Sequence, residues 1–73
     1  MKISYNRLWK LLIDRNLKKK DLIKLADISG YTLARMNKGK NVSTETLAKI
    51  CKVLNCGFDD IMEILDLGEV DEV

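Results

Sequence analysis

Apolar residues recur at helical spacing along most of this 73-residue chain. In the first segment they fall at positions i, i+3, i+4, i+7 and i+8, the spacing of one face of an α-helix. These residues are Tyr5, Leu8, Trp9, Leu12 and Ile13. The pattern predicts a helix over about residues 5 to 15 with Ser4 as its N-cap. Leu11 widens the apolar face of this helix beyond what a surface helix needs.

Three further helices are expected, over about residues 18 to 26, 30 to 37 and 44 to 54. Each has an apolar stripe at three- and four-residue spacing. The inward residues would be Leu22, Ile23, Leu25 and Ala26 in the first of these helices, Leu33 and Met36 in the second, and Leu47, Ile50, Cys51 and Leu54 in the third.

Capping and turn residues stand at the expected ends of these helices. Ser29 and Ser43 are suited to N-cap the helices that follow them, because a serine hydroxyl can accept a free backbone N–H there. Gly39 is suited to end the helix before it. Asp27 favours a tight turn, since aspartate tolerates the left-handed backbone conformation better than most residues.

The last third of the chain predicts a turn at residues 55 to 57 and then a short fifth helix. The inward residues of that helix would be Phe58, Ile61, Met62 and Leu65. Residues 67 to 73 show no periodicity and are expected to form a short, loose acidic tail. The predicted organisation is one all-α, five-helix domain over residues 1 to 66, followed by this tail.

The charges divide the chain into two opposed halves. Residues 1 to 40 carry eleven Lys or Arg against three Asp, a balance of +8, and residues 41 to 73 carry two Lys against eight acids, a balance of −6. Such asymmetry indicates a polyanionic partner for the first half. The acidic half is either a solubility surface or a means of orienting the basic half towards such a partner. Its cluster Asp59-Asp60-x-x-Glu63 is expected to be a solvated face and not a magnesium site.

The residue inventory argues against enzymes and metal sites. The chain has no His, and it has no glycine-rich phosphate loop. Cys51 and Cys56 are five apart without a second ligand pair, which is poor zinc spacing, and only Lys52 is placed to lower a thiol pKa. No apolar run approaches the roughly 20 residues of a membrane span. We expect a cytoplasmic non-enzyme with no cofactor, no metal, no membrane association and no evident small-molecule substrate.

Residues 17 to 40 have the layout of two short helices around a tight turn, with polar and basic side chains outward on the second. A protein that places one helix in the major groove of DNA and holds phosphates on either side needs this layout. Further signals follow at Ser43-x-x-x-Leu47 and in the run L-A-K-I-C-K-V-L-N-C-G-F-D-D-I at 47 to 61.

Over about residues 5 to 65, the chain resembles the Cro-type, lambda-repressor-like regulators of the Xre family, within a subgroup of small single-domain proteins. The resemblance rests on Leu17 through Leu22, Ile28-Ser29, Leu33, Lys38-Gly39-Lys40, Ser43-x-x-x-Leu47 and the run at 47 to 61. It implies a five-helix DNA-binding domain with the helix-turn-helix at helices two and three. Lys19, Ile23 and Asp27 depart from the family, which usually has Gln, Ala and Gly at these positions.

The resemblance also assigns roles to single positions. Tyr31, Thr32 and Arg35 match the residues of the recognition helix that read base edges, and Arg35 is the one suited to bidentate contact with a guanine. Gly30 matches another reading position but can offer only its backbone N–H. The positions that match contacts to the DNA backbone are Lys19, Lys20, Ser29, Gly30, Lys38, Lys40 and Asn41.

The expected function is a sequence-specific transcriptional regulator that binds double-stranded DNA as a homodimer on a two-fold operator. The dimer contact is expected at the fifth helix or at the Leu11 edge of the first. Trp9, Phe58 and Met62 are predicted to be core residues, with a dimer interface as the alternative. The alternative function is a protein-interaction module, such as an antitoxin-like partner that neutralises another protein through its acidic, apolar C-terminal half.

Overall fold

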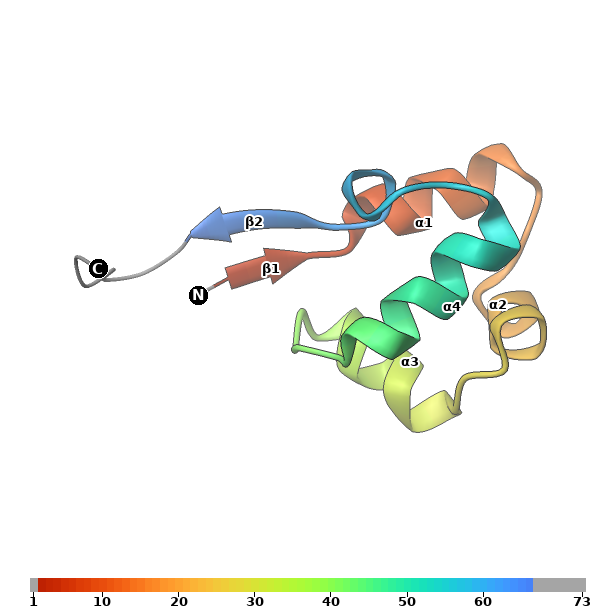
Figure 1. Cartoon of the computed structure of the whole chain (residues 1–73), viewed down its shortest axis with the longest axis horizontal. Coiled ribbons are helices and arrows are strands. Elements are labelled where there is room, and N and C mark those ends of the chain that lie inside the picture. Colours follow the sequence, from red (N-terminus) through yellow and green to blue (C-terminus); the bar gives the residue numbers. More distant parts are fainter. Residues whose placement is uncertain (1, 67–73) are drawn as a thin grey trace.

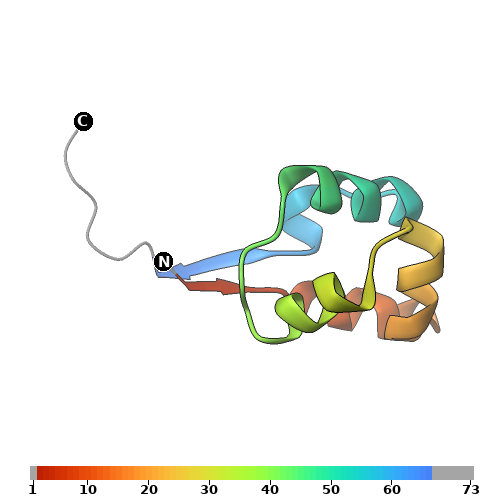
Figure 2. The same cartoon turned by 90° about the horizontal axis from the view of Figure 1, so that it is seen from below.

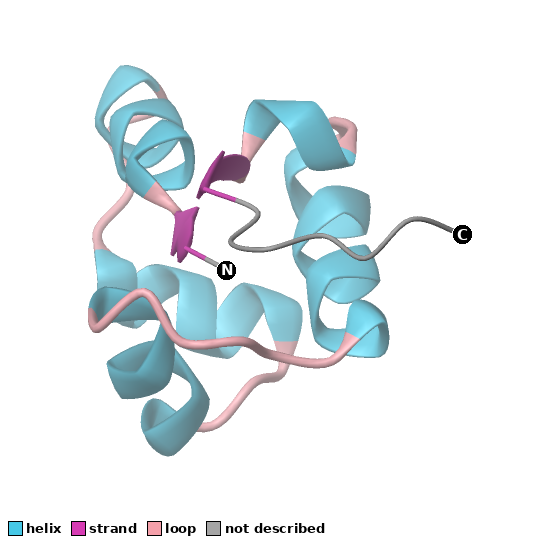
Figure 3. Ribbon diagram, turned by 90° about the vertical axis from the view of Figure 1, so that its left-hand side faces the viewer, coloured by secondary structure: helices cyan, strands magenta, loops and turns pink. Residues whose placement is uncertain are grey.

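In the computed structural model, which describes residues 2–66, helices pack around a common core and two short strands project from it (Figure 1). The elements are β1 (Lys2–Ser4), α1 (Asn6–Asp14), α2 (Lys19–Ala26), α3 (Gly30–Asn37), α4 (Thr44–Leu54), the 3-10 helix η1 (Phe58–Asp60) and β2 (Glu63–Asp66). β1 and β2 form an antiparallel ribbon that extends away from the helices (Figure 2). Figure 3 shows the ribbon nearly end-on, with the helices behind it.

The first four predicted helices are confirmed, and two of their predicted caps form. The Ser29 hydroxyl accepts the Thr32 N–H (3.0 Å), and the Ser43 hydroxyl accepts the Thr46 N–H (3.1 Å). The prediction that Ser4 caps the first helix is wrong by one residue, because Ser4 ends β1 and α1 begins after it. The Ser4 hydroxyl nevertheless accepts the N–H of the first helical residue (3.2 Å).

Short polar residues and one glycine form the turns between helices. Asn16, Asp27 and Asn55 have φ values of 57°, 54° and 53°, in the left-handed region that Asn and Asp tolerate. The prediction for Asp27 is therefore confirmed. Gly39 (φ 71°) follows the end of α3, and a Cβ there would lie 3.1 Å from the Ile3 carbonyl oxygen. Both its conformation and its close approach to β1 require glycine.

The fifth helix predicted over residues 58 to 65 is wrong. Only one turn forms there, η1, and it is closed by the N–H groups of Ile61 and Met62 on the Phe58 carbonyl (3.1 and 3.0 Å). The chain then straightens, and β2 pairs with β1 from Glu63 onward. An isolated eight-residue helix is marginal in water, whereas the pairing satisfies backbone groups of both terminal segments. The described residues thus hold four α-helices and a two-stranded ribbon.

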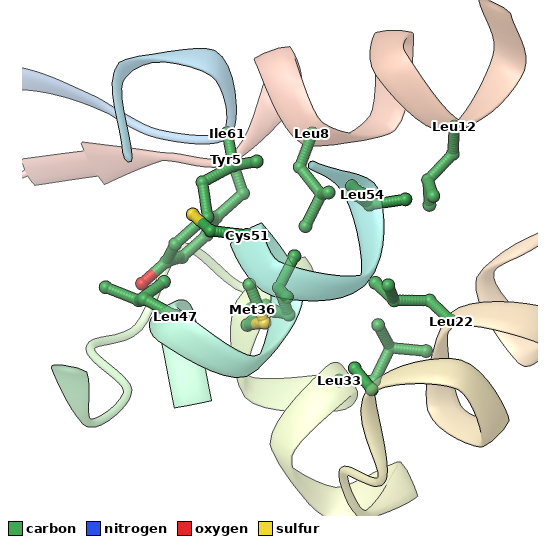
Figure 4. Close-up of a cluster of buried hydrophobic side chains, with 12 residues drawn as sticks. Tyr5, Leu8, Leu12, Leu22, Leu33, Met36, Leu47, Cys51, Leu54 and Ile61 are labelled. Carbon is green, nitrogen blue, oxygen red and sulfur yellow. The ribbon is translucent and has the colours of Figure 1, made fainter. Parts of the chain in front are cut away.

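One apolar cluster joins the four helices and Ile61, the residue that follows η1 (Figure 4). Its buried members are Tyr5, Leu8, Leu12, Leu22, Ala26, Leu33, Met36, Leu47, Ile50, Cys51, Leu54 and Ile61. Trp9 and Met62 are partly buried and pack against this cluster, as predicted.

Four apolar side chains that were expected to face inward are exposed instead. They are Ile13 (72% exposed), Leu25 (51%), Phe58 (41%) and Leu65 (59%), which lies in β2. The apolar faces of α1 and α2 are wider than the area that a core of this size covers. Phe58 is exposed because the chain turns at η1, which leaves Ile61 as the residue of this segment that enters the core.

No helix in residues 2–66 is long and apolar enough to cross a membrane. The predicted tail at residues 67 to 73 lies outside the described residues.

Two truncations test whether this C-terminal segment folds as η1 and β2 or as a fifth helix. They are Ile61→Ala and Phe58→Ala. Ile61 is fully buried, so we expect its truncation to lower the free energy of unfolding by about 2–5 kcal/mol. Phe58→Ala should lower the free energy of unfolding clearly less, although it removes more atoms, because the ring is already partly in water. Urea unfolding of both variants measures the difference, and equal losses would contradict the η1–β2 arrangement.

Candidate nucleic-acid interface

Helix α3 presents its outer face because its inner face is anchored by two buried residues. Leu33 and Met36 enter the core, and this fixes the rotation of the helix about its axis. Tyr31 is consequently 73% exposed, and Thr32 and Arg35 are partly exposed. The three residues predicted to read bases therefore occupy positions at or near the surface of one short helix.

The first turn of α3 is closed by its own side chains. Besides accepting the Thr32 N–H, the Ser29 hydroxyl lies 2.9 Å from the Thr32 hydroxyl. At Gly30, the first residue of the helix, a Cβ would meet no heavy atom within 4 Å apart from those of its chain neighbours and its own helix backbone. The backbone at the start of α3 is therefore open to a close-fitting partner. Its free N–H groups and the positive end of the helix dipole favour an anion such as a phosphate.

Arg35 does not extend freely from α3. Its Nε and Nη2 atoms donate to the Asn41 carbonyl oxygen, at 3.3 and 2.9 Å. The guanidinium is thus held against the turn between α3 and α4. An arginine has five N–H donors, so the remaining ones are available for a base or a phosphate.

Tyr5 holds the same turn from the other side. Its ring is buried at the start of α1, and its hydroxyl donates to the Lys40 carbonyl oxygen (3.1 Å). Burial raises the pKa of the Tyr5 hydroxyl, while a backbone hydrogen bond with Val42 and the charge of Arg35 act in the opposite direction. The phenol therefore stays neutral and remains a donor at physiological pH. Tyr5 was predicted only as a core residue, although a buried tyrosine hydroxyl itself signals a missing partner.

Lys19 is exposed, but its ammonium group contacts other residues of the protein. Its Nζ atom lies 4.3 Å from the centre of the Trp9 ring and donates to the Asn37 side-chain oxygen at 2.7 Å. It therefore connects α1, the start of α2 and the last residue of α3. Asn37 was not predicted as a site residue, and nothing in its sequence context distinguishes it from an ordinary helix-ending asparagine.

The remaining predicted backbone contacts are exposed. Lys20 lies in the first turn of α2, and Lys38, Lys40 and Asn41 lie in the turn after α3. Cations therefore flank α3 both through the neighbouring helix and through the following turn. The arrangement suits a partner with negative charge on both sides of a central groove.

The acidic cluster lies on a different part of the molecule. In Figure 1, η1 lies along the upper side of the molecule against α1, and α3 lies along the lower side. The Arg7 guanidinium donates to the Asp59 carbonyl oxygen (2.9 Å) and lies 3.5 Å from the Glu63 carboxylate. The Asp60 carboxylate accepts the Gly57 N–H (2.9 Å). These contacts stabilise the turn, and they keep the acids away from the face that carries α3.

The Cys51 thiol offers little reactivity. Both cysteines are free, and Cys51 is buried on α4. Burial raises the pKa of the Cys51 thiol to about 11, with smaller contributions from Cys56 and Asp60. Such a thiol is almost entirely protonated at neutral pH and is a poor nucleophile. Within residues 2–66, no three His, Cys, Asp or Glu side chains are grouped closely enough to hold a metal ion.

Comparisons with known proteins agree with this geometry. The model of the Cro/C1-type helix-turn-helix DNA-binding domain matches residues 7–66. Among solved structures, the chain is similar to the crystal structure of the transcriptional regulator VanUg, with 50% sequence identity and a TM-score of 0.83. The match covers 85% of this chain and 83% of that one. No curated protein matches the chain.

Tyr5→Phe removes the hydroxyl that holds the turn after α3 and leaves the ring in the core. We expect the free energy of unfolding to fall by about 1 kcal/mol, the usual net contribution of one such hydrogen bond. Tyr31→Phe is the matched control, because it removes the same atom from an exposed ring and should change stability little. Urea unfolding of the two variants tests this, and indistinguishable stabilities would show that the Tyr5 hydroxyl does not hold the turn.

Proposed function

Because the chain belongs to the Cro/C1-type helix-turn-helix family of DNA-binding domains, we propose that it is a sequence-specific transcriptional regulator. Helix α3 would lie in the major groove of double-stranded DNA, with two copies of the chain on a two-fold operator. The transcriptional role is supported by the similarity to VanUg, which is described as a transcriptional regulator.

The observation that best supports this proposal is the capped, outward α3 with exposed cations on either side. Tyr31, Thr32 and Arg35 would contact base edges, Arg35 through the guanidinium donors that the Asn41 carbonyl leaves free. Tyr31 is the most exposed of the three and would reach furthest.

Contacts to the DNA backbone would fix the position of α3 in the groove. Lys20, Lys38, Lys40 and Asn41 would contact phosphates on the two sides, and the backbone at Ser29 and Gly30 would contact one at the start of α3. Lys19 would contribute with the donors that Asn37 does not use.

A homodimer would double this surface, because one module of this size contacts about one half-site. The fifth helix expected to form the interface does not exist, and Leu11 is only partly exposed. Exposed apolar side chains at the C-terminal end of the described chain are better placed for pairing. They are Phe58 and Ile64, which line one hollow, and Leu65 on the other face of β2.

We expect DNA affinity to fall steeply with salt. If about five or six phosphates are neutralised per protomer, a plot of log affinity against log salt should have a slope of roughly −5 per protomer. Fluorescence anisotropy with a labelled duplex at several salt concentrations measures it. An affinity that stays constant between low and physiological salt would contradict binding through these lysines.

Arg35→Ala and Lys40→Ala separate base reading from backbone contact. Arg35→Ala should weaken the free energy of binding to the preferred DNA sequence by about 1–3 kcal/mol and relax the preference at one base pair. Lys40→Ala should weaken binding to all sequences nearly equally and reduce the salt slope by about one.

The deciding quantity is the ratio of specific to non-specific affinity, measured on a sequence selected from random DNA. Arg35 also holds the turn at Asn41, and loss of that contact alone would lower both affinities together. A ratio left intact by Arg35→Ala would therefore show that Arg35 supports the turn without reading a base.

A further inference from the structure

An apolar hollow of about 390 Å³ lies between the second half of α1 and the start of α2. Its volume falls in the range of about 300–1,000 Å³ that is typical of small-molecule sites. The lining residues are Trp9, Leu12, Ile13, Leu17, Lys18 and Lys19. Leu12 is buried and forms the floor, whereas Ile13 is 72% exposed. The hollow is therefore open to solvent on one side.

The charges in the lining of the hollow indicate which kind of molecule could bind there. The only ionisable residues in its lining are Lys18 and Lys19, so the lining carries two positive charges and no acid. The other four lining side chains are apolar. A complementary ligand has an apolar body for these walls and a single anionic group for the lysines. A small carboxylic acid with an aliphatic or aromatic body has this chemistry.

Lys19 connects the hollow to the DNA-reading helix. Its ammonium group lies over the Trp9 ring (4.3 Å) and donates to the side chain of Asn37, the last residue of α3 (2.7 Å). A carboxylate at the hollow would compete with Asn37 for this ammonium group, because a charged acceptor binds it more strongly than an amide oxygen. The same carboxylate would neutralise positive charge beside Lys20, where we place a DNA phosphate.

We propose that this hollow is an effector site for a small amphiphilic carboxylate, and that its occupation weakens DNA binding. The effect on DNA rests on the proposed function, whereas binding of the carboxylate does not. The carboxylate would hold the Lys19 ammonium group away from Asn37 and from the phosphate backbone. Its apolar body would cover Trp9, Ile13 and Leu17.

The first experiment measures ligand binding without DNA. Trp9 is the only tryptophan of the chain and lines the hollow, so its fluorescence reports directly on occupation. Decanoate is the probe, because it does not absorb where tryptophan does, and decanol is the uncharged control of equal length. We expect a saturable change with decanoate below its micelle concentration, and binding of decanol weaker by roughly a few-fold, as for loss of an exposed ion pair.

Two matched variants locate the binding. Ile13→Ser removes an exposed wall of the hollow, and Leu25→Ser removes an apolar side chain of similar size that is also exposed but outside this lining. Neither residue is in the buried core, so thermal unfolding should change little in either variant. The decanoate response of Trp9 should be lost in Ile13→Ser and kept in Leu25→Ser. An equal response in both variants would overturn the site.

The second experiment measures DNA affinity by anisotropy at saturating decanoate. We expect affinity to fall several-fold in the unaltered protein and in Leu25→Ser, and to stay constant in Ile13→Ser. A change of Trp9 fluorescence with decanoate, without any DNA binding, would contradict the proposed function but still support the ligand site. Equal binding of decanol and decanoate, together with sedimentation of the protein on phosphatidylglycerol vesicles, would instead identify a membrane surface and overturn the effector site.

Discussion

The shared apolar core is the constraint on which the other elements depend, and α4 contributes four of its twelve buried residues. The helices are eight to eleven residues long, too short to be stable alone in water. Each therefore depends on burying one face in this core, to which α4 contributes Leu47, Ile50, Cys51 and Leu54. α2 and η1 contact α4 directly, α3 contacts α2, and α1 contacts η1. The direction in which α3 faces outward is thus a consequence of core packing.

Polar contacts then fix the parts that packing leaves free. The turn after α3 has little apolar surface of its own, and it is held by Tyr5 on the Lys40 carbonyl and by Arg35 on the Asn41 carbonyl. Lys19 connects the end of α3 to α1 through Asn37 and Trp9. All three donors come from residues with a large apolar part, so each contributes both to packing and to the position of the candidate DNA surface.

Local chemistry made much of this arrangement predictable from the sequence. Ser29 and Ser43 cap helices wherever a free N–H lies within reach, and Asp27 tolerates the left-handed backbone, so these features depend on few neighbours. The prediction failed where distant segments decide the outcome. The spacing of Phe58 to Leu65 suits a helix, and only the presence of β1 sixty residues earlier explains the strand that forms. Likewise, the sequence shows Lys19 only as one cation of a basic run, because its contacts with Trp9 and Asn37 form only in the folded chain.

The ribbon has a consequence for the order in which the chain folds. It joins Ser4 to Glu63, so nearly the whole described chain must be closed into a loop before the first pair of strands forms. That closure gains little burial, since Ile64 and Leu65 remain 50% and 59% exposed. Helices α2, α3 and α4 depend on contacts closer in sequence, which form faster. We therefore expect the ribbon to assemble after these three helices and to open without unfolding them, so that its amides exchange with solvent ahead of those in α4.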